Sequence, residues 1–277
     1  MGLRLILGLM MSLLVLAPAA SAKTVVVGHR ASAGLAPENT LAAVKQSLKL
    51  GVDAIEIDVR RSKDGALVAF HDKQLQRTTN GQGNVDDMTL AQLNALDAGS
   101  WFGPQYIDEW IPTLAEVMNA MAHSKTTLII NLRVPGLEAK VLEHIRTYHM
   151  QDRVILKSFN PEVLRKLAQL APDIPRMYVI FGWYQRFNLL LSDEIRRQDP
   201  LAMPVQYLEV YHSFMSPELL SQAHQHNMQL YVWGVHSRQA MAKMLTLGVD
   251  GIETDYPDRL FSLIDEFRLK QLTGFKH

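Results

Sequence analysis

The stretch AIEIDVRRSKDGALVAFHD, residues 54–72, contains two short apolar runs typical of β-strands, 54–59 and 67–71, joined by a polar linker. The linker is too short for the helical crossover that parallel strands require. It contains Asp64-Gly65, a pair that favours the tight turn of an antiparallel hairpin. The sequence therefore predicts a hairpin here.

The hairpin turn also sets which side chains face one another. With a two-residue turn, Lys63 pairs with Ala66, and Asp58 lies opposite His71 on the same face. A three-residue or four-residue turn would shift this pairing. The two-residue register predicts that a carboxylate and an imidazole meet at the open end of the hairpin.

Outward from the hairpin, Val/Ile/Leu-rich runs alternate with stretches of helical periodicity. The further runs are 25–29, 128–132, 154–159, 177–181, 205–210, 230–235 and 251–255. Repeated strand–helix alternation over a chain of this length predicts an α/β fold with a parallel sheet closed into a (β/α)8 TIM-type barrel. There are nine runs, one more than the eight strands of such a barrel, because one run is the second arm of the hairpin.

The segment of about 73–112, after the third run, is rich in Gly, Asn, Asp and aromatic residues. It is predicted to be an insertion over one barrel mouth, with a short helix at 89–97.

The N-terminus has the features of a secretory signal peptide, residues 1–22. One arginine precedes an apolar run from Leu5 to Leu16, and Ala20-Ser21-Ala22 resembles a cleavage site. An uncleaved membrane anchor is the alternative, but the apolar run is shorter than the roughly 20 residues that span a bilayer. We therefore expect a secreted or periplasmic barrel domain, residues 23–277, without an integral membrane segment after cleavage.

The composition of the chain limits the kinds of molecule that it can be expected to bind. The chain has 28 basic and 28 acidic side chains, so its formal net charge is zero. No long basic run provides a site for a polyanion, and we expect no nucleic-acid binding. The absence of cysteine excludes disulfides, so packing alone must stabilise the domain.

A pair of carboxylates lies within the first arm of the hairpin. Glu56 and Asp58 are two residues apart, so on a strand they point to one face. Burying two adjacent carboxylates without compensation is costly, and an oxygen-seeking cation such as Ca²⁺ or Mg²⁺ is the usual partner. The alternative is a solvated strand end in which Arg60 or Arg61 pairs with the carboxylates.

Two histidines also follow predicted strands. His29 precedes Arg30 at the end of the first run, and His71 ends the second arm of the hairpin. Histidine exchanges protons near neutral pH, and the carboxyl ends of barrel strands form the active-site rim. Together with the carboxylate pair, these histidines indicate acid–base catalysis at that rim.

The ordered motifs of the chain resemble the glycerophosphodiester phosphodiesterase family. The likeness spans nearly the whole of residues 23–277 and is carried by the segments GHRASAGLAPENTLAAV (28–44), GVDAIEIDVRRSKDGALVAFHD (51–72), LQRTTNGQG (75–83), LDAGSWF (96–102) and YVWGVHSRQAMAKMLTLGVDGIETDYPDRL (231–260). The combination is far more specific than any one of its parts.

This resemblance implies a TIM-type barrel and assigns roles to residues that match the family's motifs. It implies that His29 and His71 are the general acid and base and that Arg30 binds the substrate phosphate. It also implies that Glu56 and Asp58 bind a divalent metal, Ca²⁺ or Mg²⁺.

One departure from the family lies on the run 128–132. The family usually has a glutamate and, two residues later, a lysine, where this chain has Asn131 and Arg133. Both point to one face of a strand, so Asn131 is expected to be a metal ligand and Arg133 a phosphate ligand. An asparagine carbonyl can coordinate the metal but brings no charge, so we expect weaker metal binding.

Other residues extend the candidate site. Trp233 is a candidate for contact with the glycerol or head group, although a core role is equally compatible with its position. Lys157 is a further candidate phosphate ligand, but strand alternation allows only one of Lys157 and Ser158 to face inward. Glu209 could replace the lost carboxylate, although a surface position is the favoured expectation.

The resemblance implies a metal-dependent phosphodiesterase that hydrolyses glycerophosphodiesters to glycerol 3-phosphate and an alcohol. The expected substrate is a small glycerophosphodiester or a lysophospholipid. Asn131 leaves two alternatives open: a metal-independent phosphodiesterase of the same fold, and a non-catalytic phosphodiester-binding protein.

Overall fold

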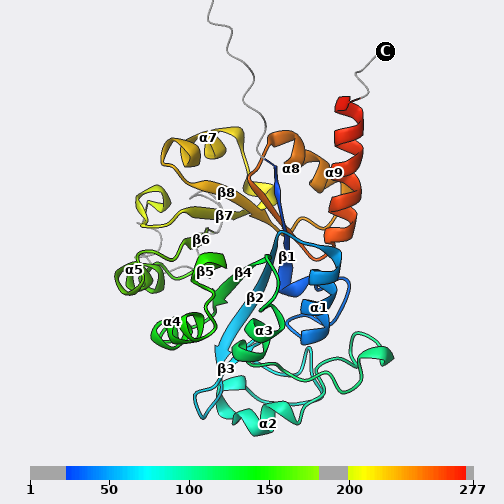
Figure 1. Cartoon of the computed structure of the whole chain (residues 1–277), viewed down its shortest axis with the longest axis vertical. Coiled ribbons are helices and arrows are strands. Elements are labelled where there is room, and N and C mark those ends of the chain that lie inside the picture. The colour runs from blue at the N-terminus through cyan, green and yellow to red at the C-terminus, as the bar shows by residue number, and fades with distance from the viewer. Residues whose placement is uncertain (1–22, 181–198, 273–277) are drawn as a thin grey trace, which may run out of the picture.

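A computed structural model of the chain describes residues 23–180 and 199–272. The predicted signal peptide lies outside these described residues. The fold is a closed parallel β-barrel with helices on its outer face, as the sequence predicts (Figure 1). The strand order around the barrel is β1-β9-β8-β7-β6-β5-β4-β2, and β1 pairs with β2 to complete the closure. The additional strand, β3, pairs antiparallel with β2 outside this circle.

The strands match the predicted runs to within a few residues. Their bounds are β1 Val25–Gly28, β2 Ala54–Arg61, β3 Leu67–Ala69, β4 Thr127–Leu132, β5 Val154–Ser158, β6 Arg176–Ile180, β7 Tyr207–Tyr211, β8 Gln229–Trp233 and β9 Gly251–Thr254.

The helices lie mostly between consecutive barrel strands. Their bounds are α1 Leu41–Leu50, α2 Leu90–Asn94, α3 Leu114–Ala120, α4 Glu138–Thr147, α5 Pro161–Leu170, α7 Pro217–Gln225, α8 Arg238–Leu247 and α9 Pro257–Leu272. Local signals set the ends of these helices. The Thr40 side chain accepts a hydrogen bond from Ala43 N at the start of α1, and Gly51, with φ +78°, ends that helix in the left-handed region.

The barrel interior is apolar at one level and charged at the next. The apolar level is filled by buried side chains from several strands: Val27, Ala54, Ile129, Ile155, Met177 and Tyr231. Nearer the carboxyl ends of the strands, the interior side chains are polar and buried: Glu56, Asn131, Lys157, Glu209 and Glu253. The apolar level therefore forms the floor beneath a charged site.

The hairpin exists, but its predicted register is wrong by one residue. The structure pairs Val59 with Ala69, and Phe70 N donates to Asp58 O at 2.9 Å, so Phe70 rather than His71 lies opposite Asp58. The turn has three residues instead of two, with Gly65 at φ +86°. A glycine in the left-handed conformation at the end of a three-residue loop is a common hairpin geometry.

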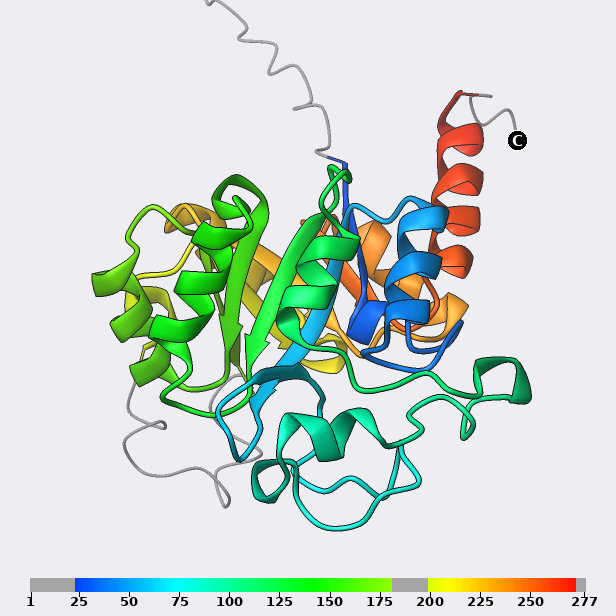
Figure 2. The same cartoon turned by 60° about the horizontal axis from the view of Figure 1, so that its bottom comes forward.

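The segment 73–112 packs on this hairpin. Its buried side chains Leu75, Val85 and Leu93 form a small core with Val68 and Phe70, separate from the main barrel clusters. Helix α2 lies within the predicted range 89–97. Figure 2 shows this segment at the carboxyl ends of the barrel strands, so it stands beside the barrel mouth.

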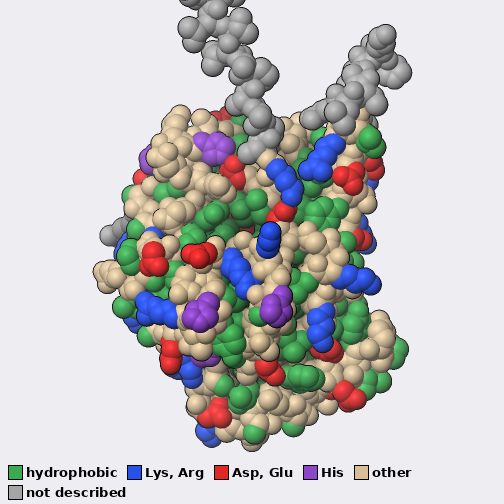
Figure 3. All heavy atoms as spheres, viewed as in Figure 1, with side chains coloured by type: hydrophobic (Ala, Val, Ile, Leu, Met, Phe, Trp, Pro, Cys, Tyr) green, Lys and Arg blue, Asp and Glu red, His purple; other side chains and the backbone are tan. Residues whose placement is uncertain are grey.

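The surface is electrostatically mixed. On the face seen in Figure 1, side chains of both charges are interspersed, as expected for a chain of zero formal net charge (Figure 3). Within the described part of the chain, none of the helices combines the length and apolar character needed to cross a membrane.

Candidate functional site

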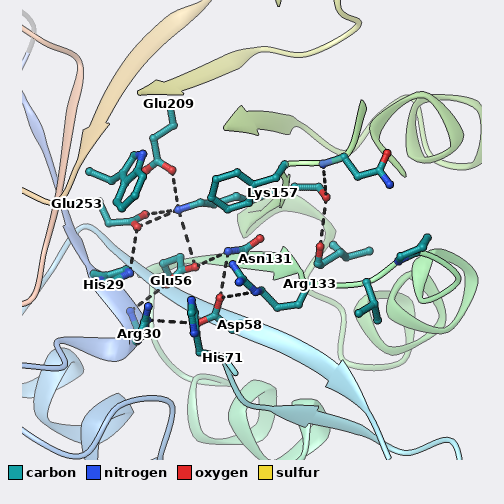
Figure 4. Close-up of a pocket in the computed structure, with 17 residues that line it drawn as sticks. His29, Arg30, Glu56, Asp58, His71, Asn131, Arg133, Lys157, Glu209 and Glu253 are labelled. Atoms are coloured by element: carbon teal, nitrogen blue, oxygen red, sulfur yellow. Dashed lines mark hydrogen bonds and ion pairs between the residues drawn. The ribbon is translucent and has the colours of Figure 1, made fainter. Parts of the chain in front are cut away.

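A pocket of about 480 Å³ lies at the carboxyl ends of the barrel strands. All the site residues predicted from the sequence line it: His29, Arg30, Glu56, Asp58, His71, Asn131, Arg133 and Trp233. The charged side chains converge from several strands on one space, as Figure 4 shows. The structure therefore brings all of these predicted residues together in one pocket.

A tight turn after β1 directs two of these residues. Residues His29–Ala31 form a single 3-10 turn, in which Arg30 has φ +46° and Ala31 has φ +61°. The left-handed region costs a non-glycine residue roughly 1–2 kcal/mol. The turn is held in part by a hydrogen bond from Arg30 N to Glu56 Oε2 at 2.9 Å. This bond connects the end of β1 to the carboxylates of β2.

Glu56 and Asp58 lie side by side and are almost fully buried, each 1% exposed. Burial and the neighbouring Asp58 raise the pKa of Glu56. Burial would also raise the pKa of Asp58, but the positive charges of Arg133 and Arg30 and the nearby His71 outweigh it and hold that pKa below its ordinary value. The solvated-end alternative is therefore wrong for these side chains.

Strand β4 supplies Asn131 directly beside the carboxylates. Asn131 pairs in register with Asp58, and its Nδ2 donates to Glu56 Oε1 at 3.2 Å and to Asp58 Oδ1 at 3.1 Å. Its Oδ1 is buried and has no hydrogen-bond partner among the described residues. Arg133 lies on the same face of the strand, with Nε 3.7 Å from Asp58 Oδ1.

His29 is held by a carboxylate that the sequence analysis did not single out. Its Nδ1 lies 2.6 Å from Asp255 Oδ1, just after β9, and its Nε2 lies 3.8 Å from Glu253 Oε1. Burial alone would lower the pKa of His29, but the hydrogen bond to Asp255 and the charges of Glu253 and Glu56 outweigh it and raise this pKa to about 9. His29 is therefore protonated at neutral pH in this environment.

His71 has the opposite electrostatic setting. Its Nδ1 lies 2.5 Å from Asp72 Oδ1, and Asp72 in turn accepts a hydrogen bond from Arg77 Nε at 2.6 Å. Burial lowers the pKa of His71, and the positive charges of Arg30 and Arg133 lower it further. The attraction of Asp58 and Asp72 does not reverse this shift, so His71 is neutral at pH 7. The pocket thus contains one protonated and one neutral imidazole.

Three further charged residues lie in the barrel interior beneath the histidines. Lys157 points inward from β5, and its Nζ lies 2.7 Å from Glu209 Oε2 and 2.7 Å from Glu253 Oε2. Burial would lower the pKa of Lys157, but these carboxylates outweigh it and raise that pKa. Burial and the negative charge of Glu209 raise the pKa of Glu253 to about 7.

The structure corrects one expectation here and adds two residues. Glu209 is fully buried inside the barrel, so the favoured surface position is wrong. It is ion-paired to Lys157 in an orientation that is not a hydrogen bond, and it has no hydrogen-bond partner among the described residues. Glu253 and Asp255 were missed. Their spacing of two within the predicted run 251–255, the same signal that identified Glu56 and Asp58, could have found them.

The pocket has the donor atoms of a metal site. His29, Glu56 and Glu253 each offer a ligand atom, and these atoms lie within 4.8 Å of one another. The Asp58 carboxylate and the Asn131 side chain lie beside Glu56, with Asn131 Nδ2 between the two carboxylates. Oxygen-rich sites of this kind suit hard divalent cations.

The pocket also has apolar lining on two sides. Leu132, Val134, Pro135 and Phe159 lie at the ends of β4 and β5, and Trp233 lies at the end of β8, across the barrel from β4. The Trp233 ring packs edge-on against Tyr211, and its Nε1 is buried without a hydrogen-bond partner among the described residues. The tryptophan that was predicted to contact substrate therefore lines the pocket.

The comparisons with known proteins agree with this arrangement. The sequence profile of the glycerophosphoryl diester phosphodiesterase family matches residues 29–259. A glycerophosphodiester phosphodiesterase of Caldanaerobacter subterraneus is 35% identical over 249 residues, which cover 87% of this chain and 98% of that protein.

Solved structures give the same result. A phosphodiesterase of Oleispira antarctica, solved with its product sn-glycerol 3-phosphate, has a TM-score of 0.77 and 32% identity, covering 87% of this chain and 96% of its own. A glycerophosphodiester phosphodiesterase of Agrobacterium tumefaciens has a TM-score of 0.73 and 28% identity, and the match covers 86% of this chain and 99% of that chain. From its sequence motifs, its barrel and these matches, the chain belongs to the glycerophosphoryl diester phosphodiesterase family.

Proposed function

We propose that the protein hydrolyses glycerophosphodiesters to glycerol 3-phosphate and an alcohol. The observation that carries this proposal is the convergence of His29, His71 and Arg30 with two buried carboxylates in one pocket. The complex of the Oleispira antarctica relative with sn-glycerol 3-phosphate supports the same product here. The protein acts after export, in the periplasm or outside the cell.

Two arginines bind the substrate phosphate. The Nε atoms of Arg30 and Arg133 are buried and lack hydrogen-bond partners among the described residues, and each lies more than 3.5 Å from the Asp58 carboxylate. Leaving a buried donor unsatisfied is costly, so a bound anion would stabilise both groups. Guanidinium groups match the geometry of phosphate oxygens, and their charge offsets negative charge in the transition state.

Glu56, Asp58 and Asn131 hold a divalent cation, Ca²⁺ or Mg²⁺. The fit rests on the oxygen-rich donor set. Asn131 now turns its Nδ2 to Glu56 and Asp58, so it would join the ligands through a flip of its amide, which brings Oδ1, a buried acceptor without a partner among the described residues, to the cation. When bound, the cation neutralises phosphate oxygens as a Lewis acid. Only two of these three ligands carry charge, so the affinity is lower than that of a site with three carboxylates.

The two imidazoles transfer the protons. Neutral His71 accepts the proton of the attacking hydroxyl, and protonated His29 donates a proton to the departing alcohol. The nucleophile is water or the substrate's own glycerol hydroxyl. In the second case a cyclic phosphate forms as the alcohol leaves, and water then opens it to glycerol 3-phosphate, with His29 accepting the proton of the water and His71 returning a proton to the glycerol oxygen. Asp255 fixes the orientation of the His29 ring and holds its proton. General acid–base catalysis of this kind contributes roughly 10²–10⁴-fold.

The apolar lining contacts the organic portions of the substrate. Trp233 on one side of the pocket and Phe159 on another provide aromatic surface for a head group or for the glycerol carbons, and the chain of a lysophospholipid would lie against one of these sides.

The test is release of glycerol 3-phosphate from glycerophosphocholine by the purified protein, after chelation and with Ca²⁺ or Mg²⁺ added back. We expect activity that requires the added cation and disappears in His29→Ala. His224→Ala is the matched control. His224 Nε2 lies 2.8 Å from Asp250 Oδ2, and this pair is not part of the pocket, so the substitution should leave activity unchanged.

Other outcomes separate the alternatives. Full activity in chelator would overturn the metal requirement but keep the hydrolase. A wild-type protein that binds glycerol 3-phosphate but turns over no diester, while Asn131→Glu does, would identify a binding protein.

A further inference from the structure

Lys157 lines the pocket but has no part in the reaction proposed above. Its side chain is 3% exposed, and its Nζ lies 2.7 Å from carboxylate oxygens of both Glu209 and Glu253. The same Nζ lies 3.8 Å from Glu56 Oε1. Three carboxylates from three strands thus surround one ammonium group (Figure 4), and we call these four residues the lysine cluster.

Packing does not require the lysine cluster. The adjacent level of the barrel interior is filled by apolar side chains such as Val27, Ile129 and Ile155. Replacing a buried ion pair by apolar residues of similar volume is often neutral or stabilising. Glu209 is fully buried, and its charge is compensated by Lys157 Nζ at 2.7 Å, so the two charges are present as a pair. These charges therefore point to a role at the site above them.

Glu56 connects the lysine cluster to the outer part of the pocket. Its Oε2 accepts a hydrogen bond from Arg30 N, while its Oε1 faces Asn131 Nδ2 at 3.2 Å and Lys157 Nζ at 3.8 Å. Any cation held by Glu56 must therefore share this carboxylate with the ammonium group. Charge interactions at such distances in a buried site are strong.

We propose that Lys157 is a built-in cation that occupies the inner side of Glu56 and weakens the binding of a divalent ion on the outer side. The ammonium group neutralises part of the charge of Glu56 and repels a second cation. When no divalent ion is bound, the ammonium group of Lys157 and the amide group of Asn131 remain as partners of the buried carboxylates. This inference rests on the proposed divalent site at Glu56, Asp58 and Asn131.

The test is the dissociation constant for Ca²⁺ and for Mg²⁺, measured by calorimetry on chelator-treated protein. We expect Lys157→Met to bind the preferred ion at least about 10-fold more tightly than wild type. We expect Glu209→Gln to bind it more weakly, because Lys157 then loses one of its neutralising partners. If the dissociation constants of Lys157→Met and Glu209→Gln shift in opposite directions, the effect is electrostatic, because a general loosening of the barrel would weaken binding in both variants.

Lys157→Met leaves three buried carboxylates with fewer partners and could fail to fold. The double variant Lys157→Met/Glu209→Gln removes the ion pair as a unit and keeps the net charge. Compared with Glu209→Gln alone, it should bind the ion at least about 10-fold more tightly. Lys166→Met is the matched control, because Lys166 pairs with Glu138 at 3.0 Å outside the pocket and should leave the constant unchanged.

Three outcomes decide the inference. Tighter binding without Lys157 and weaker binding in Glu209→Gln support it. Equal constants in all variants overturn it, and the proposed hydrolase stands if wild type still releases glycerol 3-phosphate. If neither wild type nor any variant binds a divalent ion, the inference fails, and the activity assay in chelator separately decides whether the hydrolase is metal-free.

Discussion

Asp255→Asn should move the alkaline limit of activity to lower pH. Asp255 Oδ1 lies 2.6 Å from His29 Nδ1, and this hydrogen bond is the main interaction that raises the pKa of His29 to about 9. Asparagine keeps the shape of the side chain but removes its charge. His29 would then lose its proton at a lower pH and could no longer donate it to the leaving alcohol.

The size of the shift follows from the interaction removed. A hydrogen bond to a charged group contributes about 1.5–3 kcal/mol. One pKa unit corresponds to about 1.36 kcal/mol, so the pKa of His29 should fall by about 1–2 units, to roughly 7–8. At pH 8.5 the protonated fraction of His29 would drop from about three-quarters to below about one-quarter, and kcat/KM would fall at least about 3-fold beyond any loss seen at pH 6.5.

The same pair stabilises the fold over a defined pH range. The raised pKa of His29 contributes stability that is fully present below its unfolded value of 6.5 and is lost as pH rises through about 9. The pKa of Asp255 is lowered, because the hydrogen bond and charge of His29 outweigh its burial, so its contribution is lost as pH falls through that lowered value. The unfolding free energy of Asp255→Asn should therefore approach that of wild type above about pH 9.

The assay is the pH profile of kcat/KM, with the His29 ring titration followed by NMR. Asp250→Asn is the control, because Asp250 also pairs with a histidine, His224, but away from the pocket. An alkaline limit that stays near 9 in Asp255→Asn would refute the reasoning. So would an equal shift in the control.

Three further changes test the phosphate site and the packing. Arg30→Lys keeps the charge but loses the planar guanidinium group, so kcat/KM should fall about 10–100-fold, which steady-state kinetics would measure. Gly234→Ala adds a Cβ 2.3 Å from the Tyr211 ring at φ +74°, so urea unfolding should show a loss of about 1–3 kcal/mol; no loss would contradict the close contact. Leu230→Ala removes a fully buried side chain and should cost about 2–5 kcal/mol in the same measurement, without changing KM.

The barrel could be predicted because its signals are local. Each strand is a short apolar run, and the helices between them begin and end at residues such as Thr40 and Gly51. The hairpin register could not be predicted, because it depended on whether the turn held two or three residues. Gly65 is compatible with both turns, and only the folded loop decides between them.

The candidate site also has residues that a local sequence pattern indicates and residues that it does not. Glu56 and Asp58 were found because their spacing places them on one face of a strand. Glu209 was expected at the surface because no local pattern indicates that a buried lysine on another strand, Lys157, is its partner. The neutralisation of one buried charge by another is a property of the closed barrel. A pattern within one strand does not contain it.

The small core on the hairpin has a consequence for the order in which this molecule loses activity. His29 follows a barrel strand, whereas His71 lies where the segment 73–112 leaves the hairpin, next to a cluster with few buried side chains. Such clusters open with less free energy than the main core. On warming, we expect amide exchange in this segment, and with it the displacement of one imidazole, to precede melting of the barrel. The enzyme would then become inactive while most of its chain is still folded.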